Sequence, residues 1–127
     1  MAGRVLFIAD GQSDDLATVG ALLGGLLDHG AAAELRPGGL ASLLSAEHSL
    51  ADLVVVDLDA PSFAGLPASD GIGRVASRLP VVLLSREDSN TRRLWALETG
   101  AVAYVTKPVD GAALFRYLVR ILDGGRR

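Results

Sequence analysis

The amino-acid sequence predicts an α/β protein built on a doubly wound, five-stranded parallel sheet. Five short apolar runs alternate along the chain with five segments whose apolar residues recur at helical spacing. One run, residues 52–57, is apolar throughout between two Asp residues, which is typical of a strand covered on both faces. Helical crossovers between such runs favour a parallel sheet, and 127 residues suffice for one domain of this kind.

The chain opens with an expected strand and helix. Residues 4–9 form an apolar run that is closed by an Asp-Gly turn sequence. Ser13 or Asp14 can cap the helix that follows, and this helix ends near Gly30. We therefore expect the first strand and the first helix within residues 4–30.

The middle of the chain contains the weakest and the strongest of the expected strands. Residues 31–35 form a weak strand, after which a Pro-Gly-Gly turn at 37–39 leads to a short helix. The strand at 52–57 comes next. A loop bounded by prolines at 61–67 then leads to a third helix, whose propensity is lowered by two glycines.

The last third of the chain repeats the alternation twice. Residues 80–85 form a buried strand, and the capped helix after it ends at Gly100, which suits the position just beyond a helix. Residues 103–106 form the fifth strand, and Asp110 caps the last helix. The residues of this helix that we expect to face the core are Leu114, Leu118 and Ile121.

Four polar residues stand where expected strands end. In a sheet of order 2-1-3-4-5, the C-terminal ends of strands 1, 3, 4 and 5 share one edge, next to the point where the helices change faces. The residues at these ends are Asp10, Asp57, Ser85 and Lys107. Asp57 alone could equally be a turn former that ends its strand. The convergence of all four favours a functional site.

These residue types suit the transfer of a phosphoryl group. Two nearby carboxylates repel each other unless a cation lies between them, and Mg²⁺ prefers such oxygen ligands. Asp57 could then attack a phosphoryl group as a carboxylate nucleophile, with Lys107 and Ser85 stabilising the transferred charge. The set is sufficient for self-phosphorylation from an activated donor and supplies no separate substrate pocket, so we do not expect an enzyme.

Three stretches carry a resemblance to a known family. They are Asp57 to Pro61 together with Gly65, then Ser85, and then Gly100 to Pro108, the most specific of the three. Over nearly its whole length the chain resembles the receiver domain of bacterial two-component response regulators, of the chemotaxis-regulator type. The resemblance implies a single receiver domain over residues 1–127 with a flavodoxin-like fold.

The resemblance also implies roles for individual residues. Asp57 would accept a phosphoryl group from a histidine kinase or a phosphotransfer protein, with Mg²⁺ as the cofactor. Lys107 would precede a cis-proline at Pro108, which is physically reasonable because cis bonds cost little before proline. Tyr104 would be the aromatic residue that repacks together with Ser85 when the domain switches.

Two positions depart from the family pattern. Receivers usually end the first strand with two adjacent acidic residues, whereas this chain has Ala9-Asp10. We expect Asp59 to restore the missing carboxylate and to bind the metal with Asp10 and Asp57. Arg86 stands where the family generally has a small residue. It could point to solvent, pair with Asp59 or plug the site, and the first two arrangements are favoured.

Two functions follow. The leading hypothesis is a phosphorylatable receiver that switches protein–protein interactions. The alternative is a phosphorylation-independent, receiver-like interaction module, which the two departures favour. A flavin- or nucleotide-binding protein is a weaker third hypothesis, because neither G-x-x-x-x-G-K-[ST] nor G-x-G-x-x-G follows the first strand.

A partner surface is expected around helix 4, strand 5 and helix 5. Arg92, Trp95 and Thr99 share one side of helix 4, where Trp95 is either an exposed interface residue or a partly buried cover of the sheet edge. Helix 5 carries apolar residues beside its core stripe, which indicates homodimerisation or docking of a downstream protein. These residues are Phe115, Val119 and Leu122.

Composition excludes several classes of protein. The net charge is −3 and the basic residues form no cluster larger than a pair, such as the terminal Arg126-Arg127, so we expect no nucleic-acid partner. The absence of cysteine excludes disulfides and thiolate sites. No apolar stretch approaches the roughly 18 residues of a membrane span, so we expect a cytoplasmic protein without a membrane partner. The two histidines, His29 and His48, are expected at the surface.

Overall fold

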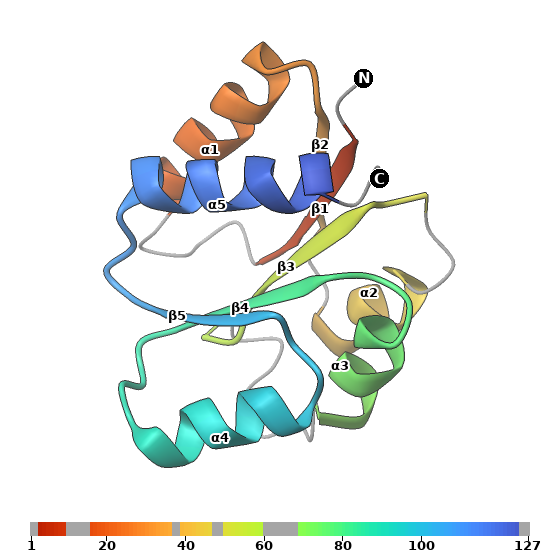
Figure 1. The fold of residues 1–127 in the computed structure, drawn as a ribbon, viewed down its shortest axis with the longest axis vertical. Coiled ribbons are helices and arrows are strands. Elements are labelled where there is room, and N and C mark those ends of the chain that lie inside the picture. The colour runs from red at the N-terminus through yellow and green to blue at the C-terminus, as the bar shows by residue number, and fades with distance from the viewer. Residues whose placement is uncertain (1–2, 10–15, 37–38, 47–49, 60–68, 125–127) are drawn as a thin grey trace.

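A computed structural model describes residues 3–9, 16–36, 39–46, 50–59 and 69–124, and these form one parallel sheet with helices on both faces (Figure 1). The strand order is β2-β1-β3-β4-β5, and every neighbouring pair is parallel. The predicted topology is therefore confirmed. The strands are β1 (Arg4–Ile8), β2 (Ala32–Arg36), β3 (Leu53–Asp57), β4 (Val81–Ser85) and β5 (Ala103–Thr106).

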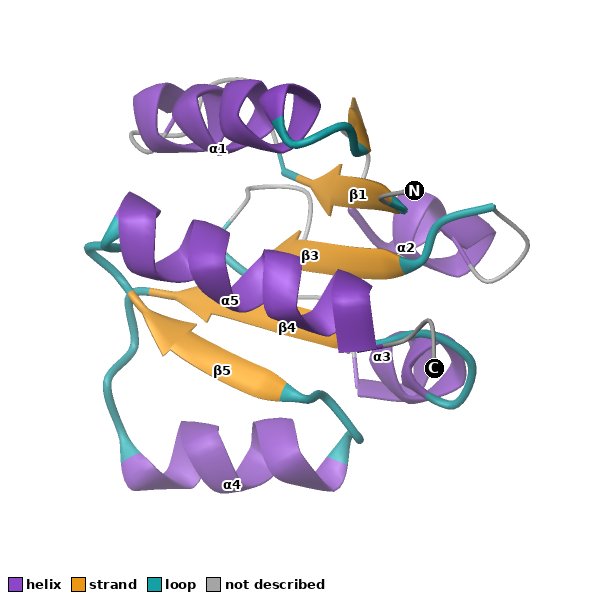
Figure 2. Ribbon diagram, turned by 45° about the horizontal axis from the view of Figure 1, so that its top comes forward, coloured by secondary structure: helices purple, strands orange, loops and turns teal. Residues whose placement is uncertain are grey.

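Five helices connect and follow the strands. They are α1 (Leu16–Asp28), α2 (Gly39–Ala46), α3 (Ser69–Ala76), α4 (Asn90–Glu98) and α5 (Gly111–Gly124). Side chains of α1 and α5 pack together with one face of the sheet, and those of α2, α3 and α4 pack with the other. Figure 2 shows α5 lying across the first of these faces. No helix in the described ranges is long and apolar enough to cross a membrane.

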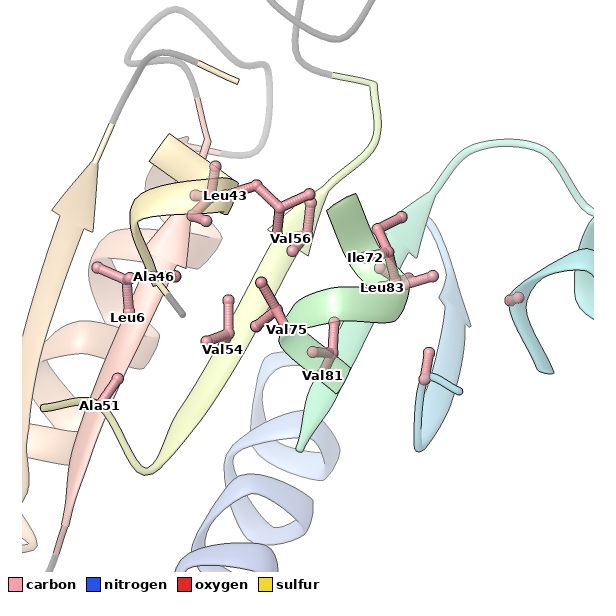
Figure 3. Close-up of a cluster of buried hydrophobic side chains, with 13 residues drawn as sticks. Leu6, Leu43, Ala46, Ala51, Val54, Val56, Ile72, Val75, Val81 and Leu83 are labelled. Atoms are coloured by element: carbon pink, nitrogen blue, oxygen red, sulfur yellow. The ribbon is translucent and has the colours of Figure 1, made fainter. Parts of the chain in front are cut away.

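The two faces of β3 contribute to two separate hydrophobic clusters. Val54 and Val56 belong to the cluster under α2, α3 and α4, part of which Figure 3 shows, whereas Leu53 and Val55 belong to the cluster under α1 and α5. Alternate residues of a strand point to opposite faces. A strand that is covered on both faces must therefore be apolar at every position, which is why the run before Asp57 contains no polar residue.

Helix ends follow the predicted signals where the structure describes them. Ser89 precedes α4, and its hydroxyl accepts a hydrogen bond from the Arg92 N–H (3.1 Å). Gly100 follows α4 with φ +94°, a conformation that favours glycine. A carboxylate oxygen of Asp110 accepts from the Ala113 N–H (3.1 Å) and caps α5. The expected caps of α1, Ser13 and Asp14, lie outside the described residues, as does His48.

The core stripe of α5 differs by one position from the prediction. Leu114 and Leu118 are buried, but the third buried residue is Leu122, whereas Ile121 is partly buried. Residues spaced by four lie nearly above one another on a helix, so a stripe at 114, 118 and 122 follows one continuous line against the sheet.

Candidate functional site

Three of the residues predicted at the strand ends are brought together by the sheet. Asp57 ends β3, Ser85 ends β4, and Lys107 follows β5 directly. They are 3%, 2% and 9% exposed, and they are the buried polar residues that the structure describes. The fourth, Asp10, lies outside the described residues. Because buried polar groups are costly unless paired, their partners define the site.

Asp57 and Lys107 form a buried ion pair. The Lys107 Nζ lies 2.8 Å from the Asp57 Oδ1, and the two side chains are 3% and 4% exposed. The same Asp57 oxygen accepts a hydrogen bond from the Asp59 N–H (3.0 Å). The Lys107 N–H donates to the Ser85 carbonyl (2.8 Å), and the bond from Lys107 to Pro108 is cis, as the resemblance implied. The turn after β5 thus directs the ammonium onto the carboxylate at the end of β3.

The carboxylate of Asp59 lies beside this pair. Its Oδ2 lies 3.2 Å from the Lys107 Nζ and accepts a hydrogen bond from the Arg86 N–H (2.8 Å). Its Oδ1 accepts from the Ser85 hydroxyl (3.3 Å). With 28% of its side chain exposed, Asp59 is the most accessible of these groups. Both of its oxygens therefore bind donors that converge from the ends of β4 and β5.

Ser85 and Tyr104 are linked through the main chain of Glu87. The Glu87 N–H donates to the Ser85 hydroxyl (3.1 Å), and the Tyr104 hydroxyl donates to the Glu87 carbonyl (2.5 Å). Tyr104 packs against the cluster under α4, and the Arg93 guanidinium lies 5.8 Å from its ring centroid. A displacement of the Ser85 hydroxyl can therefore reach Tyr104 through one peptide segment.

The side chain of Arg86 is exposed. This agrees with the favoured expectation that it points to solvent or pairs with Asp59, and disagrees with the alternative that it plugs the site. The unexpected feature is that the Arg86 main-chain N–H binds Asp59. No side-chain pattern in the sequence could have indicated this contact, because every residue except proline carries the same donor.

The described part of the site offers two carboxylates to a divalent metal, those of Asp57 and Asp59. Within the described ranges no group of three acidic or histidine residues could hold an ion. Asp57 and Asp59 supply the hard oxygens that Mg²⁺ prefers, but the Lys107 ammonium is the cation that lies between them. The adjacent position, Ala9, is 5% exposed and apolar. The third expected ligand, Asp10, lies outside the described residues.

The surface around α4 contains exposed apolar side chains. Leu94, Leu97 and Val102 are 59%, 66% and 48% exposed. Trp95 is only partly buried and packs against the core cluster, while the Arg92 guanidinium lies 4.3 Å from its ring centroid. Of the two interpretations of Trp95, the partly buried cover is the one observed.

The extra apolar residues of α5 are covered within the chain. Phe115 and Val119 pack against the cluster under α1 and α5, and the Phe115 ring meets His29 edge to face. Leu122 is buried. The packing within the chain therefore covers Leu122 fully and Phe115 and Val119 in part.

The comparisons with known proteins agree with this geometry. Residues 6–119 match the model of the response regulator receiver domain. The chain belongs to this family. The receiver is 33% identical over 123 residues to the sensory transduction protein RegX3 of Mycolicibacterium smegmatis, which covers 95% of this chain and 51% of that protein. It spans about half the length of the curated relatives it matches.

Solved structures share the fold of this receiver. A two-component response regulator from Clostridium difficile superposes with a TM-score of 0.78 at 19% identity, covering 98% of this chain and 99% of the other. The receiver domain of a sensor histidine kinase from Pseudomonas aeruginosa PAO1 has a TM-score of 0.73 at 23% identity, covering 97% and 99%. That protein was solved with a magnesium ion coordinated in its active site cleft.

Proposed function

We propose that this receiver accepts a phosphoryl group on Asp57, from a histidine kinase or a phosphotransfer protein, and changes its protein–protein interactions in response. The observation that carries the proposal is the ion pair between Asp57 and Lys107, held at 2.8 Å with both side chains almost fully buried. A paired charge of this kind is costly to bury and often lowers stability relative to apolar residues. Its place at the C-terminal edge of the sheet supports a functional role.

The proposed reaction uses the residues in distinct roles. An Asp57 oxygen attacks phosphorus, a new O–P bond forms, and the P–N bond of the donor breaks, so that the imidazole leaves with the electron pair. Lys107 neutralises charge on the phosphoryl oxygens, and the Ser85 hydroxyl can donate to one of them. Mg²⁺, when bound, supplies further neutralisation of the same charge.

We propose Asp10, Asp57 and Asp59 as the residues that bind Mg²⁺. Asp59 would join the other two through its Oδ1, which has a second lone pair besides the one that accepts from the Ser85 hydroxyl. The magnesium ion in the P. aeruginosa receiver supports the choice of metal. Substitution of Asp59 by Asn is expected to weaken Mg²⁺ binding, and Ala9→Asp to strengthen it, as measured by calorimetry.

The downstream surface proposed here is formed by α4, β5 and α5. The phosphoryl group would attract the Ser85 hydroxyl. The Glu87 main chain, which is hydrogen-bonded to both Ser85 and Tyr104, would transmit this displacement to Tyr104. The exposed side chains of Leu94 and Leu97 would then contact a downstream protein in the cytoplasm. A second copy of the chain could bind the same surface instead. Sedimentation of the phosphorylated protein distinguishes the two cases, because only self-association forms a dimer of this chain.

A phosphorylation-independent interaction module is the second candidate. The observation that favours it is Ala9, which places a buried methyl group where the family usually has a carboxylate. Fewer carboxylates would weaken the metal site and with it the phosphoryl transfer. Such a module would bind its partner equally well with and without a phosphoryl donor.

Intact mass after incubation with acetyl phosphate and Mg²⁺ tests the proposal. One added phosphoryl group is expected in the parent protein and none in Asp57→Asn. Asp52→Asn is the matched control, because Asp52 immediately precedes the same strand at its opposite end, where its carboxylate accepts from the Arg4 N–H (2.8 Å). No adduct under any metal condition would favour the phosphorylation-independent module.

A further inference from the structure

The Asp59 carboxylate accepts hydrogen bonds from the kind of donors that bind a free anion. Its carboxylate receives the Ser85 hydroxyl at 3.3 Å, the Arg86 N–H at 2.8 Å and the Lys107 ammonium at 3.2 Å. These donors come from two neighbouring strand ends and face one point. A main-chain N–H, a hydroxyl and an ammonium that converge in this way form an anion-binding site.

A phosphoryl group on Asp57 would need the same donors. The Lys107 Nζ lies 2.8 Å from the Asp57 Oδ1, so it is within reach of a group attached to that carboxylate. The Ser85 hydroxyl and the Arg86 N–H contact the same Asp59 carboxylate as this ammonium does. Asp57 and Asp59 already share the Lys107 ammonium, and a phosphoryl group on Asp57 would bring further negative charge next to the Asp59 carboxylate, where like charges repel.

From this geometry we infer that the Asp59 carboxylate occupies the phosphoryl-binding position of the unmodified receiver and competes with the incoming phosphoryl group. The inference rests on the proposed function. Phosphorylation replaces the single negative charge of the Asp57 carboxylate by the roughly two charges of a phosphoryl group, and these expel Asp59 from the donors. Its side chain is 28% exposed, so it has a direct route to solvent. Asp59 therefore sets how readily Asp57 is phosphorylated.

The competition can be removed without removing the donors. The Asp59 main-chain N–H donates to the Asp57 Oδ1, and this contact is kept by any side chain at position 59. Asp59→Asn replaces one oxygen by an amide that cannot accept hydrogen bonds, and Asp59→Ala removes the side chain beyond Cβ. Glu98→Gln is the matched control, because it removes one negative charge from the exposed side of α4.

The test measures the rate of Asp57 phosphorylation by acetyl phosphate, followed as intact mass at a Mg²⁺ concentration that saturates the rate of each variant. Saturation separates the competition from any loss of metal affinity. We expect Asp59→Ala and Asp59→Asn to react at least about fivefold faster than the parent, the factor that corresponds to giving up the net stabilisation of roughly one hydrogen bond. Glu98→Gln should react at the parental rate.

Each result of this rate measurement either supports or contradicts the inference about Asp59. Equal or slower phosphorylation of both Asp59 variants, with the parent phosphorylated on Asp57, overturns the inference and leaves the proposed function intact. Phosphorylation of the variants but not of the parent supports the inference in its strongest form. No phosphorylation of parent or variants contradicts the proposed function and the inference together.

A second measurement uses amide hydrogen exchange at Arg86, in a variant whose core amides keep the protection they have in the parent. The Arg86 N–H should be protected in the unmodified parent, lose protection in unmodified Asp59→Ala and regain it on phosphorylation. An Arg86 N–H whose exchange is the same in unmodified parent and variant overturns the inference.

Discussion

The bodies of β3 and β4 and the last residues of these strands are equally buried but opposite in chemistry. Residues 53–56 and 81–84 are apolar and at most 4% exposed, whereas Asp57 and Ser85, one residue later, are 3% and 2% exposed. Burial of the apolar residues stabilises the fold directly. Burial of the polar residues is tolerated because each has close partners. Each strand therefore contributes to stability through its apolar residues and to the candidate site through the polar residue that directly follows them.

The largest loss of stability is expected when Lys107 is removed from its ion pair with Asp57. Lys107→Met should lower the free energy of unfolding by about 3–5 kcal/mol, because the Asp57 carboxylate stays buried without its ammonium. The double variant Asp57→Asn/Lys107→Met should recover most of this loss, since neither charge is then left alone. Urea unfolding of the parent and the two variants measures both effects. A double variant as unstable as Lys107→Met would show that packing, and not charge pairing, dominates this end.

A comparable effect is expected in the apolar body of β4. Leu83→Ala should cost about 2–5 kcal/mol, because Leu83 is fully buried in the cluster of Figure 3. Leu97→Ala is the matched control at a position that is 66% exposed, and it should change stability by no more than about 0.5 kcal/mol. Phosphorylation of Leu83→Ala under folding conditions should match the parent. A loss of phosphorylation in this variant while it is folded would show that the apolar body of β4 also contributes to the reaction.

A smaller effect is expected at the end of the same strand. Ser85→Ala should cost about 1–2 kcal/mol, because the Glu87 N–H loses its acceptor and Asp59 loses a donor. Ser77→Ala, which removes an exposed hydroxyl bound to the Arg74 carbonyl, is the control and should cost less. Ser85→Ala should also abolish the change in the Tyr104 NMR signals on phosphorylation, and Ser85→Thr should restore it. An unchanged Tyr104 response in Ser85→Ala would rule out the link through Glu87.

Much of the fold could be predicted from the sequence because its signals are local. The apolar run before Asp57 specifies a doubly covered strand, and the strand order then brings Ser85 and Lys107 to the same edge. The phase of α5 was harder to predict. Ile121 and Leu122 are both large and apolar, and only the packing of a 14-residue helix against the sheet selects Leu122 as the buried residue.

The contacts within the site could be predicted only in part. The sequence indicated that Asp59 would stand near the phosphoacceptor, but not that its carboxylate would bind three donors. One of these donors is the main-chain N–H of Arg86, and the link from Ser85 to Tyr104 runs through the main chain of Glu87. Main-chain groups are the same at nearly every residue, so only the folded loop after β4 reveals which of them face the site.

Chemical trapping of the phosphorylated residue tests the central claim most directly. Borohydride reduces an aspartyl phosphate to homoserine, so peptide mass spectrometry of the reduced, phosphorylated protein identifies the residue that carried the group. We predict homoserine at position 57 in the parent and at no position in Asp57→Asn. Homoserine at position 10 or 59, or none in a protein exposed to donor and Mg²⁺, would contradict the assignment of Asp57 as the phosphoacceptor.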